Sequence, residues 1–120
     1  MAKPLALIIE DDANIASLFE MILEEEEYET EIIDHGQKAM DRLAEITPDV
    51  VLLDLYLPVV SGNTILKRIR ADSRFQDTRV IIVTATHQAA TGHTGTLATT
   101  ILVKQIDPNH LRLLIKRFDK

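Results

Sequence analysis

The sequence predicts an α/β protein in which five βα units build one doubly wound, five-stranded parallel sheet. Two observations lead to this fold class. Short runs of Val, Leu and Ile alternate along the chain with segments whose apolar residues recur at helical spacing. Runs that are apolar at every position are typical of strands covered by helices on both faces. The 120 residues, 46% of them hydrophobic, suit one compact domain over residues 1–120.

The first half of the chain contains two of these units. Residues 5–9, LALII, form the first strand, and Asp12 fits the N-cap of the helix that follows. The apolar residues of this helix recur at helical spacing, as Ile15, Leu18, Phe19, Ile22 and Leu23. Residues 30–33 form a half-polar second strand. A second helix is expected over residues 36–46, before the stop signal Thr47-Pro48-Asp49.

The next two units follow the same alternation but end less regularly. Residues 50–54, VVLLD, form the third strand, and the loop after it offers Gly62 for a positive φ angle. A third helix runs from residue 63 to about residue 71, and residues 79–84, RVIIVT, form the fourth strand. Residues 85–100 contain two glycines and six threonines. Since Gly costs a helix about 1 kcal/mol against Ala, we expect a short or irregular fourth helix.

The last unit begins with residues 101–103, ILV, as the fifth strand. Asp107 and Pro108 fit the N-cap and the first position of the final helix. The apolar stripe of this helix consists of Leu111, Leu114, Ile115 and Phe118. Because the second strand is half polar, it belongs at an edge of the sheet, and the strand order 2-1-3-4-5 satisfies this requirement.

The composition excludes several classes of function. With no cysteine, the chain cannot form disulfides, thiolate metal sites or thiol nucleophiles. A net charge of −6 disfavours direct binding to nucleic acid, which needs clustered Lys and Arg. No apolar stretch approaches membrane-spanning length, and the first residues lack the pattern of a signal peptide. We therefore expect a soluble, cytoplasmic protein with no membrane contact.

Polar side chains collect where the predicted strands end. Glu10 and Asp11 follow the first strand, Asp54 ends the third, Thr84 ends the fourth and Lys104 follows the fifth. Ligands of such sheets bind at the carboxyl ends of the strands, near the switch between strands 1 and 3. Clustered carboxylates suit Mg²⁺, or else Mn²⁺ or Ca²⁺, and a hydroxyl with an ammonium suits a phosphoryl group. Asp54 itself could be a nucleophile that forms an acyl phosphate.

With these residues in place, the chain resembles the receiver domains of bacterial response regulators, which sensor histidine kinases phosphorylate on aspartate. The resemblance covers the whole chain and implies a flavodoxin-like fold. Its motifs are IIEDD (8–12), VVLLDLYLP (50–58) followed by SG (61–62), VIIVTA (80–85) and LVK (102–104). Each motif alone is weak, but the set at these spacings is highly specific.

The resemblance implies a role for each polar residue at the strand ends. Asp54 would accept the phosphoryl group from a phosphohistidine of a sensor histidine kinase or a histidine phosphotransfer protein. Thr84 would donate a hydrogen bond to a phosphoryl oxygen, and Lys104 would pair with it. The output would be an unknown partner protein or a fused output domain. The chain would assist its own phosphorylation and dephosphorylation without being an enzyme in the turnover sense.

The resemblance also implies the ligands of a bound Mg²⁺ ion. Asp11 would bind the ion directly and Glu10 mainly through water. Asp54 and the backbone carbonyl of Tyr56 would complete the protein ligands, whereas Asp12 serves as the helix cap. From its position alone, we also expect the Tyr56 ring to shield the acyl phosphate from water.

Three features depart from the family pattern. Ile101 stands where the family usually has an aromatic residue or His that changes orientation on activation. Gln105 stands where the family usually has Pro, so we expect a trans peptide bond and an altered loop. The segment between Thr84 and Lys104 is about two residues shorter than usual in the family, which puts the familiar dimer face in doubt.

Two other functions remain open from the sequence. A receiver-like scaffold that binds partners without phosphorylation is favoured by Ile101 and the weak fourth helix, but the intact acidic, Thr and Lys set argues against it. A phosphatase or nucleotide-binding enzyme is disfavoured, because there is no GxGxxG motif or P-loop and no carboxylate two residues after Asp54. We expect either a single-domain regulator or part of a longer protein such as a hybrid kinase.

Overall fold

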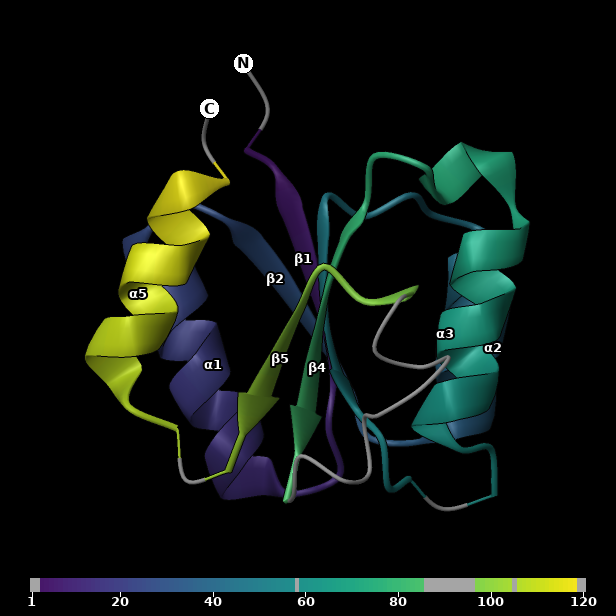
Figure 1. Ribbon diagram of the computed structural model, residues 1–120, viewed down its shortest axis with the longest axis horizontal. Helices are drawn as coiled ribbons and strands as arrows, with labels where there is room; N and C mark the ends of the chain where they lie inside the picture. The colour runs from purple at the N-terminus through teal and green to yellow at the C-terminus, as the bar shows by residue number, and fades with distance from the viewer. Residues whose placement is uncertain (1–2, 58, 86–96, 105, 119–120) are drawn as a thin grey trace.

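The computed structural model describes residues 3–57, 59–85, 97–104 and 106–118. Five parallel strands form one sheet in the order β2-β1-β3-β4-β5, which confirms the predicted topology (Figure 1). The strands are β1 (Leu5–Ile9), β2 (Glu29–Ile33), β3 (Val50–Asp54), β4 (Arg79–Thr84) and β5 (Thr100–Val103). The helices are α1 (Ala13–Glu25), α2 (Gly36–Leu43), α3 (Gly62–Ala71) and α5 (Pro108–Arg117), with a short 3₁₀ helix η1 (Ser73–Phe75).

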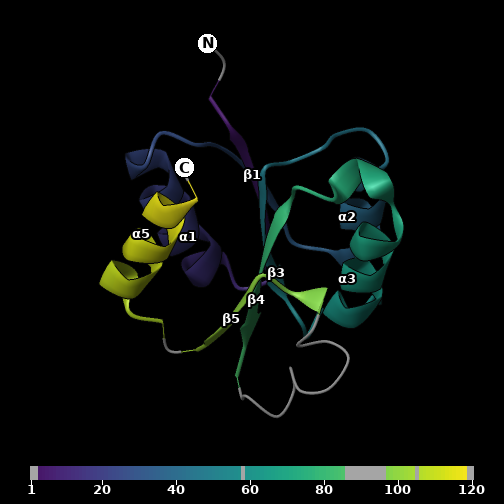
Figure 2. The ribbon, with the colours of Figure 1, turned by 45° about the horizontal axis from the view of Figure 1, so that its top comes forward.

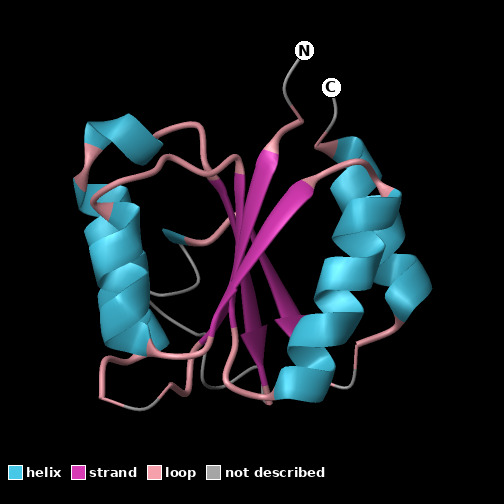
Figure 3. Ribbon diagram, turned by 180° about the vertical axis from the view of Figure 1, so that it is seen from behind, coloured by secondary structure: helices cyan, strands magenta, loops and turns pink. Residues whose placement is uncertain are grey.

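The helices form two layers around the sheet. Figures 1 and 2 show α1 and α5 on one face and α2 and α3 on the other, and Figure 3 shows the same arrangement from behind. Each face has its own apolar core, because successive side chains of a strand point to opposite faces. Every residue of β3 is buried, as expected for a central strand with helices on both sides.

The predicted caps begin the helices as expected. The Asp12 carboxylate accepts hydrogen bonds from the amides of Asn14 at 2.9 Å and Ile15 at 3.2 Å. Asp107 accepts from the amide of Asn109 at 3.0 Å, with a proline in the first turn of α5. These bonds satisfy amides that have no partner within the helix.

The second helix is shorter than the sequence predicted. It ends at Leu43 instead of residue 46. The guanidinium of Arg74, in the middle of η1, donates to the carbonyl oxygens of Leu43 and Ala44. These carbonyls therefore have a partner from another element, and the chain turns away after Ala44.

Gly62 does not have the positive φ angle that the sequence predicted for it. Gly62 is the first residue of α3, and the positive φ angle in this loop, 69°, belongs to Val59. A Cβ atom on Gly62 would overlap the backbone oxygen of Asp54 and come within 2.6 Å of the Leu55 Cα. Close packing, and not backbone conformation, therefore requires glycine at this position.

Two predictions fall outside the described residues. The fourth helix was expected within residues 85–100, of which 86–96 are not described, and the peptide bond before Gln105 is likewise not described. Within the described part of the chain, no helix combines the length and apolar character needed to cross a membrane.

Candidate functional site

The strand register brings the predicted site residues to one edge of the sheet. Ile9 pairs with Leu53, so Glu10 follows β1 beside Asp54 at the end of β3. In the same way, the pairing of β3 with β4 and of β4 with β5 places Thr84 and Lys104 at successive strand ends. The amide of Lys104 donates to the Thr84 carbonyl oxygen at 2.7 Å, which extends the ladder to this edge.

Three carboxylates converge at this edge. Glu10, Asp11 and Asp54 each offer one oxygen, and the three atoms lie within 4.8 Å of one another. Opposite ligands of an octahedral Mg²⁺ ion lie about 4.2 Å apart, so a small side-chain movement would let them share one ion or its water shell. An all-oxygen donor set suits Mg²⁺. The residues therefore fit the predicted cation.

The charges of the cluster are unbalanced. The Lys104 Nζ lies 3.4 Å from the Glu10 Oε1 and 3.4 Å from the Asp54 Oδ2. This ammonium thus contacts two of the three carboxylates, Glu10 and Asp54, and both are almost fully buried. Since ionised carboxylates crowded in one place repel each other, a divalent cation at this edge would favour their charged forms.

Burial and neighbouring charge change the protonation of this cluster. Burial, reinforced by the charge of Asp54, raises the pKa of Glu10 to about 7, although the amide of Asp12 and the ammonium of Lys104 oppose the change. Burial by itself would lower the pKa of Lys104, but Glu10 and Asp54 together raise it above its usual value. Lys104 is therefore a permanent positive charge beside the Asp54 carboxylate.

Backbone amides orient two of the carboxylates. The amide of Tyr56 donates to the Asp54 Oδ1 at 3.0 Å, and Lys104 contacts the other oxygen. The amide of Asp12 donates to the Glu10 Oε2 at 3.1 Å. Sequence reasoning assigned Tyr56 a carbonyl role and missed its amide, although a turn directly after a strand-end Asp is a signal for such a bond.

Two buried oxygens at the strand ends have no hydrogen-bond partner among the residues that the structure describes. They are the Glu10 Oε1, which has only the ionic contact with Lys104, and the Thr84 Oγ1. An unpaired buried hydroxyl is costly unless a ligand or water satisfies it. The Thr84 hydroxyl is therefore available to an oxygen-rich ligand at this edge.

The two residues expected to affect activation and lifetime have different surroundings. The Tyr56 side chain is 63% exposed. Ile101 pairs with Ile82 in the sheet and is half-buried against the core on the α2 and α3 face. An aliphatic side chain therefore packs at the position where the family usually has an aromatic residue or His.

Comparisons with known proteins agree with this geometry. The sequence profile of the response regulator receiver domain matches residues 6–116. The DNA-binding response regulator MtrA of Mycolicibacterium paratuberculosis is 39% identical over 67 residues, which are 56% of this chain and 30% of that protein. The chain spans about a third of the length of the curated relatives it matches.

Solved structures share the fold over nearly the whole chain. A CheY-like response regulator receiver domain from Methylobacillus flagellatus superposes with a TM-score of 0.86 at 25% identity, covering 97% of this chain and 98% of that one. A sensor protein from Polaromonas sp. JS666 gives a TM-score of 0.84 at 30% identity, covering 97% and 96%.

Proposed function

The chain belongs to the response regulator receiver domains of two-component systems, and from this premise we propose that Asp54 accepts a phosphoryl group. The donor is a phosphohistidine on a sensor histidine kinase or a histidine phosphotransfer protein. The observation that carries the proposal is the arrangement around Asp54. Its carboxylate is buried at a strand end, one oxygen accepts from a backbone amide, and the other lies 3.4 Å from the Lys104 ammonium.

The reaction transfers one phosphoryl group between two proteins. An Asp54 carboxylate oxygen attacks the phosphorus, the bond from phosphorus to the donor imidazole nitrogen breaks, and that nitrogen keeps the electron pair. The product is an acyl phosphate on Asp54. Lys104 pairs with a phosphoryl oxygen. The Thr84 hydroxyl, which has no partner among the described residues, donates to another.

The acidic residues provide the site of the cation. The oxygen donors of the site suit Mg²⁺. When bound, this cation would supply positive charge that offsets the negative charge of the phosphoryl group. We assign Asp11 and Asp54 as direct ligands and Glu10 as a ligand through water. The backbone carbonyl of Tyr56 completes the proposed protein ligands.

The proposed role is signalling and not substrate turnover. The domain assists its own phosphorylation and dephosphorylation, and the phosphorylated form binds an output protein or a fused output domain. MtrA is described as DNA-binding, but the proposal for this chain includes no direct contact with nucleic acid or membrane. A cytoplasmic location is part of the same proposal.

The test is the intact mass of the protein after incubation with acetyl phosphate and Mg²⁺. We expect the wild type to gain one phosphoryl group and Asp54→Asn to gain none. Asp34→Asn is the matched control, since Asp34 is an exposed carboxylate just after β2, and it should gain the group as the wild type does. A chelator should prevent the gain in every variant.

A wild type that gains no phosphoryl group from acetyl phosphate or from histidine kinases would contradict the proposal. That result would favour the scaffold that binds its partners without phosphorylation. A gain that persists in Asp54→Asn would place the acceptor on another residue.

A further inference from the structure

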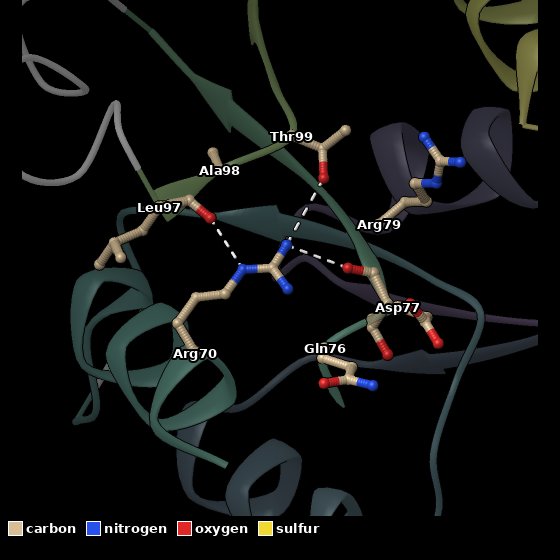
Figure 4. Close-up of a pocket in the computed structure, with 8 residues that line it drawn as sticks. Arg70, Gln76, Asp77, Arg79, Leu97, Ala98 and Thr99 are labelled. Atoms are coloured by element: carbon tan, nitrogen blue, oxygen red, sulfur yellow. Dashed lines mark hydrogen bonds between the residues drawn. The ribbon is translucent and has the colours of Figure 1, made fainter. Parts of the chain in front are cut away.

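The guanidinium of Arg70, at the end of α3, links three segments at the edge of the sheet opposite Asp54. Figure 4 shows its bonds to the segments before β4 and β5. It donates from Nε to the Leu97 carbonyl at 2.8 Å and from one terminal nitrogen to the Phe75 carbonyl at 3.2 Å. The other terminal nitrogen donates to the Thr78 carbonyl at 3.0 Å and the Thr99 hydroxyl at 3.5 Å. One rigid, planar group therefore connects η1, the approach to β4 and the approach to β5.

Protein oxygens already use the donors of this guanidinium. Arg70 lies in a cavity of about 660 Å³, yet each of its three nitrogens donates to the protein. Among the described residues, no carboxylate forms an ion pair with it. The arrangement is that of a structural link between segments, not that of a free group for an external anion.

The linked segment is the one that begins the pairing of β5 with β4. The amide of Thr99 donates to the Val80 carbonyl at 2.8 Å, and the amide of Val80 donates to the Thr99 hydroxyl at 3.0 Å. From there the register continues to the pair of Thr84 with Val103. Thr99 thus sets the register at the start of a strand only four residues long.

The register decides where Lys104 lies. A slip of one residue would move Lys104 about 3.3 Å along the strand and turn its side chain toward the other face. Its ammonium now lies 3.4 Å from both Glu10 and Asp54. A short edge strand has few bonds of its own to prevent such a slip, so a link at its start has a large effect at its end.

We propose that Arg70 is a positioning residue of the phosphorylation site, which fixes the register of β5 and through it the place of the Lys104 ammonium. The part of this inference that concerns the rate of phosphorylation rests on the proposed function. The effect on β5 itself can be measured without any phosphoryl donor.

The first measurement is hydrogen exchange of the Thr99 and Lys104 amides in Arg70→Met without phosphoryl donor. We expect exchange at both amides to rise about tenfold or more, with β1 and β3 unchanged. Arg68→Met is the control, because Arg68 is an exposed residue of the same helix, and it should exchange as the wild type does. Unchanged exchange in Arg70→Met would overturn the inference.

The second measurement is a double-mutant cycle on the rate of phosphorylation by acetyl phosphate. Arg70→Met should slow the wild type by about tenfold, since small displacements of a reacting group cost rate. It should have no further effect in Lys104→Met, because its influence passes through Lys104. A merely structural role would slow both backgrounds equally, and that result would overturn the inference.

Two controls keep the test decisive. If Arg70→Met does not fold, Arg70→Lys replaces it, because Lys retains the charge but lacks the planar fork of donors. It should then show the same effects at smaller amplitude. If the wild type takes up no phosphoryl group, the proposed function fails, and hydrogen exchange alone decides whether Arg70 fixes β5.

Discussion

Gly62 packs directly on the backbone of Asp54. A Cβ atom at this position would overlap the Asp54 carbonyl oxygen and lie 2.6 Å from the Leu55 Cα. The Gly62 amide also donates to the Leu55 carbonyl at 2.9 Å. The start of α3 therefore packs tightly against the backbone that positions the Asp54 carboxylate.

We predict that Gly62→Ala lowers the free energy of unfolding by about 1–3 kcal/mol, because overpacked backbone must shift to accept the methyl group. Urea denaturation measures the loss. Lys67→Ala, at an exposed position of the same helix, is the control and should change stability little. Wild-type stability in Gly62→Ala would show that the contact is easily relieved.

The neighbouring Val59 gives the opposite prediction. Its φ angle of 69° is unfavourable for a β-branched residue, and its side chain is 82% exposed. Val59→Asn should raise the free energy of unfolding by about 1 kcal/mol, since Asn tolerates this conformation. Val59→Thr is also β-branched and should give no gain. Equal stability of the two variants would mean that the backbone is not strained here.

These two residues show how far the sequence predicts the loop. Strands and the site edge follow from apolar runs that end in polar residues, so Asp54, Thr84 and Lys104 were placed correctly. The reason for Gly62 was not predicted, because a close contact between β3 and α3 cannot be read from local residue types. No residue type in the loop indicated that Val59 has the positive φ angle. The end of α2 depends in the same way on Arg74, which lies about thirty residues further along the chain than Leu43 and Ala44.

Removing the Thr84 hydroxyl should change stability and phosphorylation in opposite directions. Thr84→Val keeps the shape and removes a buried hydroxyl that has no partner among the described residues, so the free energy of unfolding should rise by about 1 kcal/mol. Phosphorylation by acetyl phosphate should nevertheless become slower, because the donor to the phosphoryl oxygen is lost. Thr84→Ser should retain the rate. A fast Thr84→Val would show that the hydroxyl does not contact the phosphoryl group.

Removing divalent cations should make stability depend on pH through Glu10. Its pKa is raised from 4.5 to about 7, mainly by burial. The folded protein therefore binds a proton that the unfolded chain releases, and stability falls as pH rises from about 4.5 through 7. In chelator, Glu10→Gln should lose this part of the pH dependence and unfold at higher urea than the wild type at about pH 8. Parallel pH profiles of the two proteins would contradict the assignment.

The Tyr56 ring should lengthen the life of the phosphorylated state. The Tyr56 amide donates to the Asp54 carboxylate, so the side chain starts next to this group, and about a third of it is covered. A ring at this place would hinder water from reaching the acyl phosphate. Tyr56→Ala should therefore shorten the half-life of the phosphorylated protein, measured by intact mass after removal of the donor. Tyr56→Phe keeps the ring and loses only the hydroxyl, so its half-life should match the wild type. If Tyr56→Ala has the wild-type half-life, the ring does not shield the site, and the access of water is set by the backbone around Asp54.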